Sequence, residues 1–142
     1  MLCLRLSILL FFMAVAGCSG GPKIVPVSGK IVYMDGTLAT NLAGYTVEFE
    51  SIDGKIDSKR VSANGTVTKE GTFMLTTLKE GDGALVGKHR VLISPPGADG
   101  DTPSKPHVIM PKYVSYETSG LTAEVGSTSR ATVTLTIEKR AK

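Results

Sequence analysis

The chain of 142 residues has little that points to a specific chemistry. It has no Trp, two cysteines and two histidines, and only 6% of its residues are aromatic. Two cysteines exclude a disulfide-rich scaffold, and 42% hydrophobic with 20% charged residues excludes a disordered chain. The net charge is only +3, and the basic residues are scattered along the sequence. No nucleic-acid partner is therefore expected.

One apolar segment lies close to the N-terminus. Leu6 to Ala16 is apolar except for Ser7, and Arg5 is the only charged residue among the first 22. A membrane-spanning helix needs about 20 apolar residues, so this segment is too short to serve as a retained anchor. A cation before the segment and small residues after it are typical of a secretory signal.

The end of this segment carries a more specific motif. Val15-Ala16-Gly17-Cys18 resembles the lipobox of bacterial lipoproteins. The resemblance implies that the Cys18 thiol receives diacylglycerol, that the chain is cut between Gly17 and Cys18, and that the new amine is acylated. Residues 1–17 would then be a signal peptide, which removes Cys3. An ordinary signal peptide that happens to contain a cysteine is the alternative.

The residues after Cys18 predict a tether. Residues 18–23 are small, polar or Pro, and the five residues from Ser19 to Lys23 reach at most about 18 Å. The expected partner is a membrane, bound through lipidated Cys18, and the expected location is the cell envelope, facing the periplasm or the cell exterior. In the sorting rule of enterobacterial lipoproteins, Ser19 after the cysteine favours the outer over the inner membrane.

Residues 24–142 alternate between apolar and polar side chains, which predicts half-buried strands in one all-β domain. The clearest run has Ala131, Val133, Leu135 and Ile137 on one face. Seven strands are expected, near 25–33, 44–51, 58–63, 66–77 (with a break at Gly71), 87–94, 120–125 and 130–138. Their number and spacing predict an antiparallel β-sandwich.

Short glycine-containing segments between these runs predict the turns. They are Asp35-Gly36, Asp53-Gly54, Asn64-Gly65, Glu70-Gly71, Gly81-Asp82-Gly83 and Ser119-Gly120.

Several segments, in this order, resemble carboxypeptidase regulatory-like (transthyretin-like) domains. They are residues 28–36 (SGKIVYMDG), 45–49 (YTVEF), 71–77 (GTFMLTT) and 81–91 (GDGALVGKHRV), and residues 110–113 and 118–122 resemble the closing region of small lipoproteins with this domain. The resemblance implies a Greek-key sandwich of about seven strands with no catalysis and no cofactor. Domains of this family often have acidic residues before the strand that begins at Gly71, where this chain has Thr68-Lys69-Glu70. This difference argues against a calcium contact at that turn.

The candidates for chemistry are few. His89 lies on the same strand face as Val91 and Ile93, so we expect a partly buried, hydrogen-bonded histidine rather than a ligand. No zinc-binding spacing and no Gly-x-Ser-x-Gly elbow occur, so neither a metal site nor a catalytic residue is expected. Glu80 and Asp82 could bind calcium weakly together with loop carboxylates, but solvated turn carboxylates are the default.

The long segment between Ser94 and Gly120 is the best place for a binding site, because long loops in compact domains are often functional. Its candidate ligand contacts are Tyr113, Tyr116, His107, Asp99 and Asp101.

Three functions of different classes follow. The third is an enzyme, such as a hydrolase, that uses His89 or His107. The first is a lipid-anchored, non-catalytic envelope protein whose β-sandwich is a structural or protein-interaction module, with other envelope proteins as partners. The alternative is a module that binds a small ligand, a glycan or calcium through residues 95–119.

Overall fold

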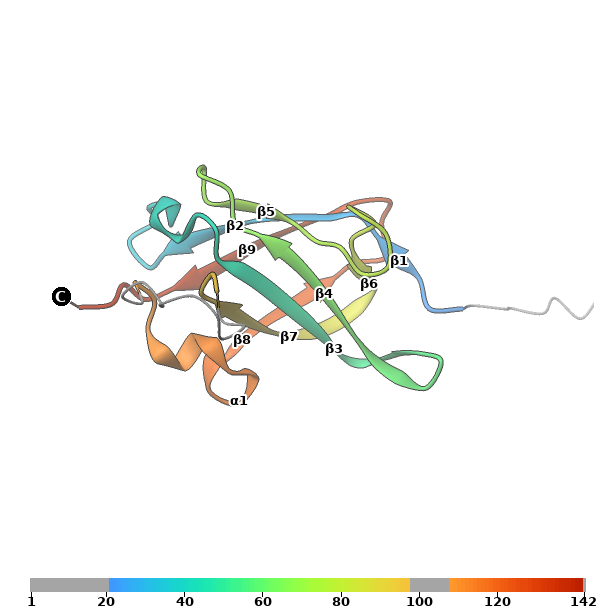
Figure 1. Ribbon diagram of the computed structural model, residues 1–142. Coiled ribbons are helices and arrows are strands. Elements are labelled where there is room, and N and C mark those ends of the chain that lie inside the picture. The colour runs from blue at the N-terminus through green and yellow to red at the C-terminus, as the bar shows by residue number, and fades with distance from the viewer. Residues whose placement is uncertain (1–20, 98–107, 142) are drawn as a thin grey trace, which may run out of the picture.

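The computed structural model describes residues 21–97 and 108–141 (Figure 1). The predictions for Gly17, Cys18, Asp99, Asp101 and His107 therefore fall outside the described residues. Within the described ranges, no helix has the length and apolar character needed to cross a bilayer.

The described chain is mostly β, as predicted, with nine strands and three short helical turns. The strands are β1 (Ile24–Val25), β2 (Val27–Tyr33), β3 (Thr46–Ile56), β4 (Lys59–Thr66), β5 (Thr72–Met74), β6 (Ala84–Leu85), β7 (Gly87–Ser94), β8 (Leu121–Val125) and β9 (Ala131–Ile137). The helical turns are η1 (Thr40–Leu42), η2 (Pro111–Val114) and α1 (Tyr116–Ser119). Seven of these strands have three residues or more, which matches the predicted number.

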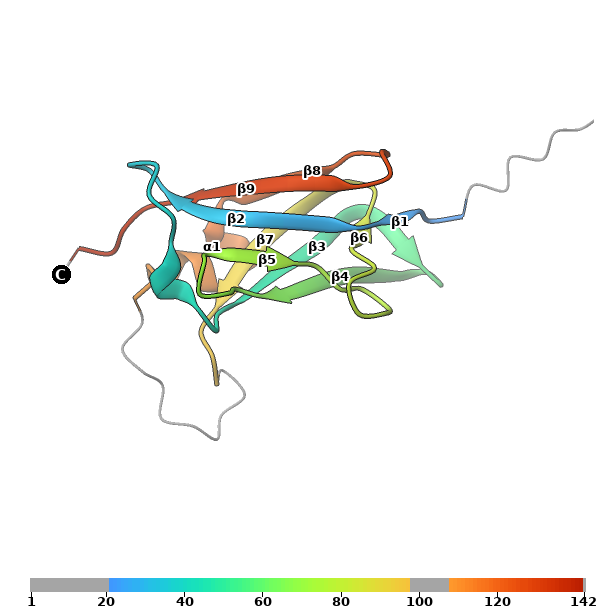
Figure 2. The same ribbon diagram turned by 90° about the horizontal axis from the view of Figure 1, so that it is seen from above.

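The strands form three sheets in a sandwich-like arrangement. One layer has the order β5-β2-β9, the other has the order β4-β3-β7-β8, and β1 pairs with β6 at one end. Figure 2 shows β2 and β9 lying above β3, β4 and β7. The core fills the space between the layers, because apolar side chains from both inner faces are buried there.

The predicted inner faces are confirmed. Alternate residues of β2, β3, β7 and β9 are buried, and their neighbours in sequence are largely exposed or half-buried. The largest fully buried side chains include Phe49, Ile31, Leu42, Leu75, Ile93, Ile109 and Ile137.

The prediction that all strands are antiparallel is wrong at one pair. β2 and β9 run parallel over seven residue pairs, from Val27 with Ala131 to Tyr33 with Ile137. A period of two places side chains on faces but carries no information on strand direction. Parallel neighbours need a long connection, and here the rest of the domain lies between the first long strand and the last.

Two of the predicted turns are wrong. Asp53-Gly54 lies within β3 and Asn64-Gly65 lies within β4, while the hairpin between them turns at Asp57 and Ser58, which both have positive φ. A Cβ on Gly65 would lie 2.2 Å from the Met74 carbonyl oxygen. This glycine therefore permits a close approach of two backbones rather than a turn.

The predicted strand at 66–77 is also shorter than expected. β4 ends at Thr66, a turn closed by hydrogen bonds between Thr68 and Thr72 follows, and β5 has only three residues. Gly71, with φ of +75°, lies in that turn, as the predicted break required. The predicted loop before Gly120 contains η2 and α1, which are too short to show a helical period in the sequence.

The sandwich has two distinct ends (Figures 1 and 2). The described chain enters beside β1, and we call this the entry end; it holds Lys23, the β3–β4 hairpin at 55–59, the loop at 78–83 and the turn at 126–130. The chain leaves after β9 at the opposite end, which also holds η1 and η2.

Candidate functional site

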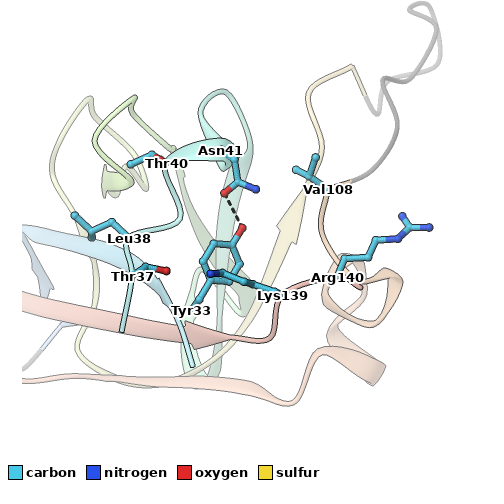
Figure 3. Close-up of a pocket in the computed structure, with 8 residues that line it drawn as sticks. All are labelled: Tyr33, Thr37, Leu38, Thr40, Asn41, Val108, Lys139 and Arg140. Atoms are coloured by element: carbon cyan, nitrogen blue, oxygen red, sulfur yellow. Dashed lines mark hydrogen bonds between the residues drawn. The ribbon is translucent and has the colours of Figure 1, made fainter. Parts of the chain in front are cut away.

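An open pocket of about 340 Å³ lies at the opposite end, away from the entry of the chain (Figure 3). Three segments that are distant in sequence form it: the end of β2 with η1, the start of the second described range, and the residues after β9. Its lining residues are Tyr33, Thr37, Leu38, Thr40, Asn41, Val108, Lys139 and Arg140.

Tyr33 forms the floor of this pocket. Its ring is buried, and its hydroxyl donates a 2.6 Å hydrogen bond to Oδ1 of Asn41. That bond orients the amide, so the Asn41 nitrogen is directed away from Tyr33 as a hydrogen-bond donor (Figure 3). The turn at 34–37 and η1 together bring Asn41 over the end of β2.

Lys139 closes one side of the pocket. Its ammonium lies 5.0 Å from the centre of the Tyr33 ring and 2.5 Å from Oδ2 of Asp35. The other Asp35 oxygen accepts bonds from the backbone N–H and the hydroxyl of Thr37. The hydrogen bond from Lys139, followed by those from Thr37, holds the pKa of Asp35 well below its usual range. Lys139 is thereby held across the ring.

The pocket combines donors with a small apolar rim. Leu38 and Val108 are 45% and 41% exposed, and the polar lining is dominated by hydroxyl, amide and cationic groups. No histidine, cysteine or carboxylate is among its described lining residues. This composition suits recognition of a polar or anionic group with an apolar neighbour.

Tyr113, predicted as a ligand contact, lies in the core instead. Only 4% of it is exposed, and its hydroxyl accepts a 2.9 Å hydrogen bond from the backbone N–H of Glu138. The Lys112 ammonium covers the ring at 5.0 Å and pairs with the Glu138 carboxylate. Tyr113 therefore joins η2 to the end of β9, and its ring is not open to a ligand.

Tyr116, the second predicted contact, packs on the outer face of β3 and β7. The Arg90 guanidinium lies 4.7 Å from the centre of its ring, and Arg90 and Arg60 both pair with Glu50. The Tyr116 hydroxyl is buried and has no hydrogen-bond partner within the described residues. Burial, reinforced by the negative charge of Glu48, raises the pKa of this phenol. Its position indicates a packing role for α1 against the sheet.

The predicted inward facing of His89 is confirmed, and the residue is more fully buried than expected. The side chain is 1% exposed, its Nδ1 lies 3.1 Å from the Gly87 carbonyl oxygen, and its ring packs against Phe49 with centroids 5.9 Å apart. Burial lowers the pKa of His89 below its ordinary value of 6.5, although the hydrogen bond with Gly87 acts in the opposite direction.

The burial of His89 predicts an acid-sensitive fold. The pKa of His89 is lower in the folded state than in the unfolded state, where it is 6.5. Below pH 6.5 the unfolded chain therefore binds a proton that the folded chain does not, and the free energy of unfolding declines; above pH 6.5 this group causes no change. We expect the free energy of unfolding to fall with decreasing pH by at most about 1.4 kcal/mol per pH unit from this group. Urea unfolding between pH 5 and 8 measures it. His89→Gln should have a flatter profile over this range, and an identical slope in both proteins would contradict the assignment.

Asp82 is not the solvated turn carboxylate that was expected. Its two oxygens accept hydrogen bonds of 2.7–3.0 Å from the backbone N–H groups of Thr77, Leu78 and Lys79. Burial raises the pKa of Asp82, but these donors outweigh it and bring the pKa below its ordinary value. The carboxylate therefore shapes the loop before β6. Among the described residues no three His, Cys, Asp or Glu side chains lie close enough to hold a metal ion.

The sequence did not point to the residues of the pocket. Tyr33 was expected only as the last residue of a strand, and Asn41 lies between two expected strands with nothing to single it out. Lys139 lies more than 100 positions further along the chain. The Asp35-Gly36 turn signal was correct, but nothing local shows which distant segment covers it.

Comparisons of the chain with models of known families, with curated proteins and with solved structures gave no match. The resemblance to transthyretin-like domains therefore remains a prediction.

Proposed function

We propose that this protein is a cell-envelope lipoprotein, anchored through lipidated Cys18, whose β-sandwich is a non-catalytic structural or protein-interaction module. The observation that carries the proposal is the small-residue motif ending in Cys18, directly behind an apolar segment too short to span a bilayer. Palmitoyl and diacylglycerol chains bound to one cysteine give stable anchoring because at least two chains enter the bilayer. The residue after the anchor, Ser19, favours the outer membrane.

We further propose that the sandwich has the Greek-key, transthyretin-like topology. Seven strands of three residues or more in two layers support it, and so does the pairing of β2 with both β5 and β9 in one layer. The motif segments at 28–36 and 71–77 contribute β2 and β5, which are neighbours in that layer.

The arrangement of the two ends supports an interaction role. A tether of five residues would hold the entry end near the membrane, and the pocket with Tyr33 and Asn41 lies at the other end of the sandwich (Figure 1). An anchored domain would thus present this pocket to the aqueous space of the envelope. A second envelope protein is the partner we expect.

Binding of a small ligand is the second candidate function, and the pocket is the observation that favours it. Its donors, Asn41 and Lys139, and its apolar residues, Leu38 and Val108, would suit a small molecule with an anionic or polar group. Among the described lining residues, Val108 is the one that comes from the segment 95–119. The ligand site proposed here therefore overlaps only partly with the segment that the sequence indicated.

Replacement of Cys18 tests the anchor. Wild-type protein in bacteria fed radiolabelled palmitate should carry the label and sediment with membranes, and Cys18→Ala should lose the label and leave the membrane fraction, because no other cysteine follows the cleavage site. Cys3→Ala is the matched control, since this cysteine precedes the site and its variant should be labelled like wild type. A Cys18→Ala variant that keeps both label and membrane association would rule the anchor out.

A further inference from the structure

We propose that the entry end of the sandwich is a docking surface for an anionic phospholipid bilayer, so that the anchored domain stands on the membrane in one orientation. This inference rests on the proposed lipid anchor at Cys18. It goes further because it states which residues of the folded domain contact the bilayer.

The chain is held to the sandwich from Lys23 onwards. The Lys23 carbonyl accepts a 2.9 Å hydrogen bond from the Val86 N–H, and its ammonium donates a 2.8 Å bond to the Ser127 carbonyl. β1 then pairs with β6. The tether thus ends against the body of the domain, and between Cys18 and Lys23 it spans at most about 18 Å.

This short tether lets the entry end come within reach of the membrane's electric field. Headgroups occupy the outer part of a bilayer, and charges act over about 8–10 Å at physiological ionic strength. The hairpin at 55–59, the loop at 78–83 and the turn at 126–130 surround the point where the tether joins the domain (Figure 2). These segments would be the first to meet the headgroups.

The entry end carries an excess of positive charge. Its cations are Lys23, Lys55, Lys59, Lys79 and Arg130, against the carboxylates Asp57, Glu80 and Asp82. One of these carboxylates, Asp82, already accepts three backbone hydrogen bonds.

The cations of the two ends differ in their partners. None of the five at the entry end forms an ion pair within the described residues, whereas Lys112 and Lys139 at the opposite end each pair with a carboxylate. Cations without a carboxylate partner, beside a lipid tether, suit an anionic headgroup layer.

Exposed apolar side chains accompany these cations. Leu78 is 67% exposed and directly precedes Lys79, and Met74 is 61% exposed. Met74 and Arg130 line a depression of about 190 Å³ together with the first residues of β2. An apolar side chain beside a cation can enter the headgroup boundary while the cation stays at the phosphates.

The absence of Trp allows a direct test. In Leu78→Trp, and in the matched variant Val114→Trp on η2 at the opposite end, one indole would be the only one in the chain. Both positions are exposed, so both variants should fold. Full-length lipidated proteins would be reconstituted into vesicles of phosphatidylethanolamine and phosphatidylglycerol with brominated acyl chains, which quench Trp fluorescence on contact.

We expect severalfold stronger quenching of Leu78→Trp than of Val114→Trp. The quenching of Leu78→Trp should decrease in vesicles made only of phosphatidylcholine with the same brominated acyl chains. It should also decrease when Lys79→Gln and Arg130→Gln are added to the Leu78→Trp protein. Equal quenching of the two variants, stronger quenching at position 114, or no dependence on lipid charge would overturn the docking surface.

A separate readout distinguishes this failure from failure of the anchor. Palmitate labelling of the same two variants reports lipidation independently of orientation. Labelled protein without selective quenching would contradict only the docking surface, whereas protein without the label would contradict the proposed function itself.

Discussion

Gly83→Ala should be among the most destabilising single substitutions in this protein, with an expected loss of about 3–5 kcal/mol of unfolding free energy. Gly83 has φ of +98°, and a Cβ there would lie 1.7 Å from the Val25 carbonyl oxygen and 2.6 Å from the Cα of Pro26. Both atoms belong to backbone that cannot rotate away. The alanine must therefore separate β1 from β6. Urea unfolding followed by circular dichroism measures the loss.

Gly36→Ala is the matched control for this effect. Gly36 also has positive φ, at +82°, but nothing lies within 4 Å of the position its Cβ would take. The cost there is only the backbone strain of a non-glycine residue, about 1–2 kcal/mol. Equal losses in the two variants would show that the contact with Val25 contributes nothing.

Gly29→Ala should cost about 3 kcal/mol for a different reason. Gly29 is the inward-facing residue in the middle of β2, and a Cβ there would lie 2.2 Å from Cζ of Phe73 and 2.7 Å from the Val133 carbonyl oxygen. The Phe73 ring is buried with its centroid 6.0 Å from that of Phe49, so it cannot move aside without disturbing the core. Thermal and urea unfolding report the loss.

A second substitution separates this steric clash from a general weakness of β2. Phe73→Leu removes the ring atoms nearest to position 29, so Gly29→Ala combined with Phe73→Leu should lose less stability than the sum of the two single variants. The rescue should be incomplete, because the Val133 carbonyl oxygen remains. Strict additivity of the two losses would contradict the proposed contact.

The glycines illustrate what could and could not be predicted. Local turn chemistry identified Gly36, Gly71 and Gly83 correctly, because a positive φ is a demand of the backbone at that point in the chain. Gly54 and Gly65 were interpreted as turns by the same rule, and both lie in strands. At Gly65 the reason is the Met74 backbone, whose carbonyl oxygen would lie 2.2 Å from a Cβ, and no local pattern reveals that contact. At Gly54 a Cβ would meet the side chains of Ser51 and Leu85, at 2.6 Å and 2.9 Å.

The candidate site shows the same division. Alternation predicted that His89 faces the core, and it does. The prediction succeeds because the face on which a side chain lies depends only on its position within its own strand. Tyr113 was placed in an exposed loop, since nothing in its neighbours shows that its hydroxyl meets the backbone of Glu138. The pocket around Tyr33 and Lys139 brings together early and late parts of the domain's sequence, and it had no counterpart in the sequence analysis.

By itself, the sequence determined the β class, the approximate positions of the long strands and the inner faces of β2, β3, β7 and β9. It also contains the N-terminal motif from which we infer the anchor. Tertiary structure alone decided that β2 runs parallel to β9, that the hairpin turns at Asp57 rather than Asp53, and that the pocket lies opposite the entry of the chain. The reason is sequence distance. The period of a strand relates residues two positions apart, whereas pairing direction and pocket walls depend on contacts between residues more than 100 positions apart.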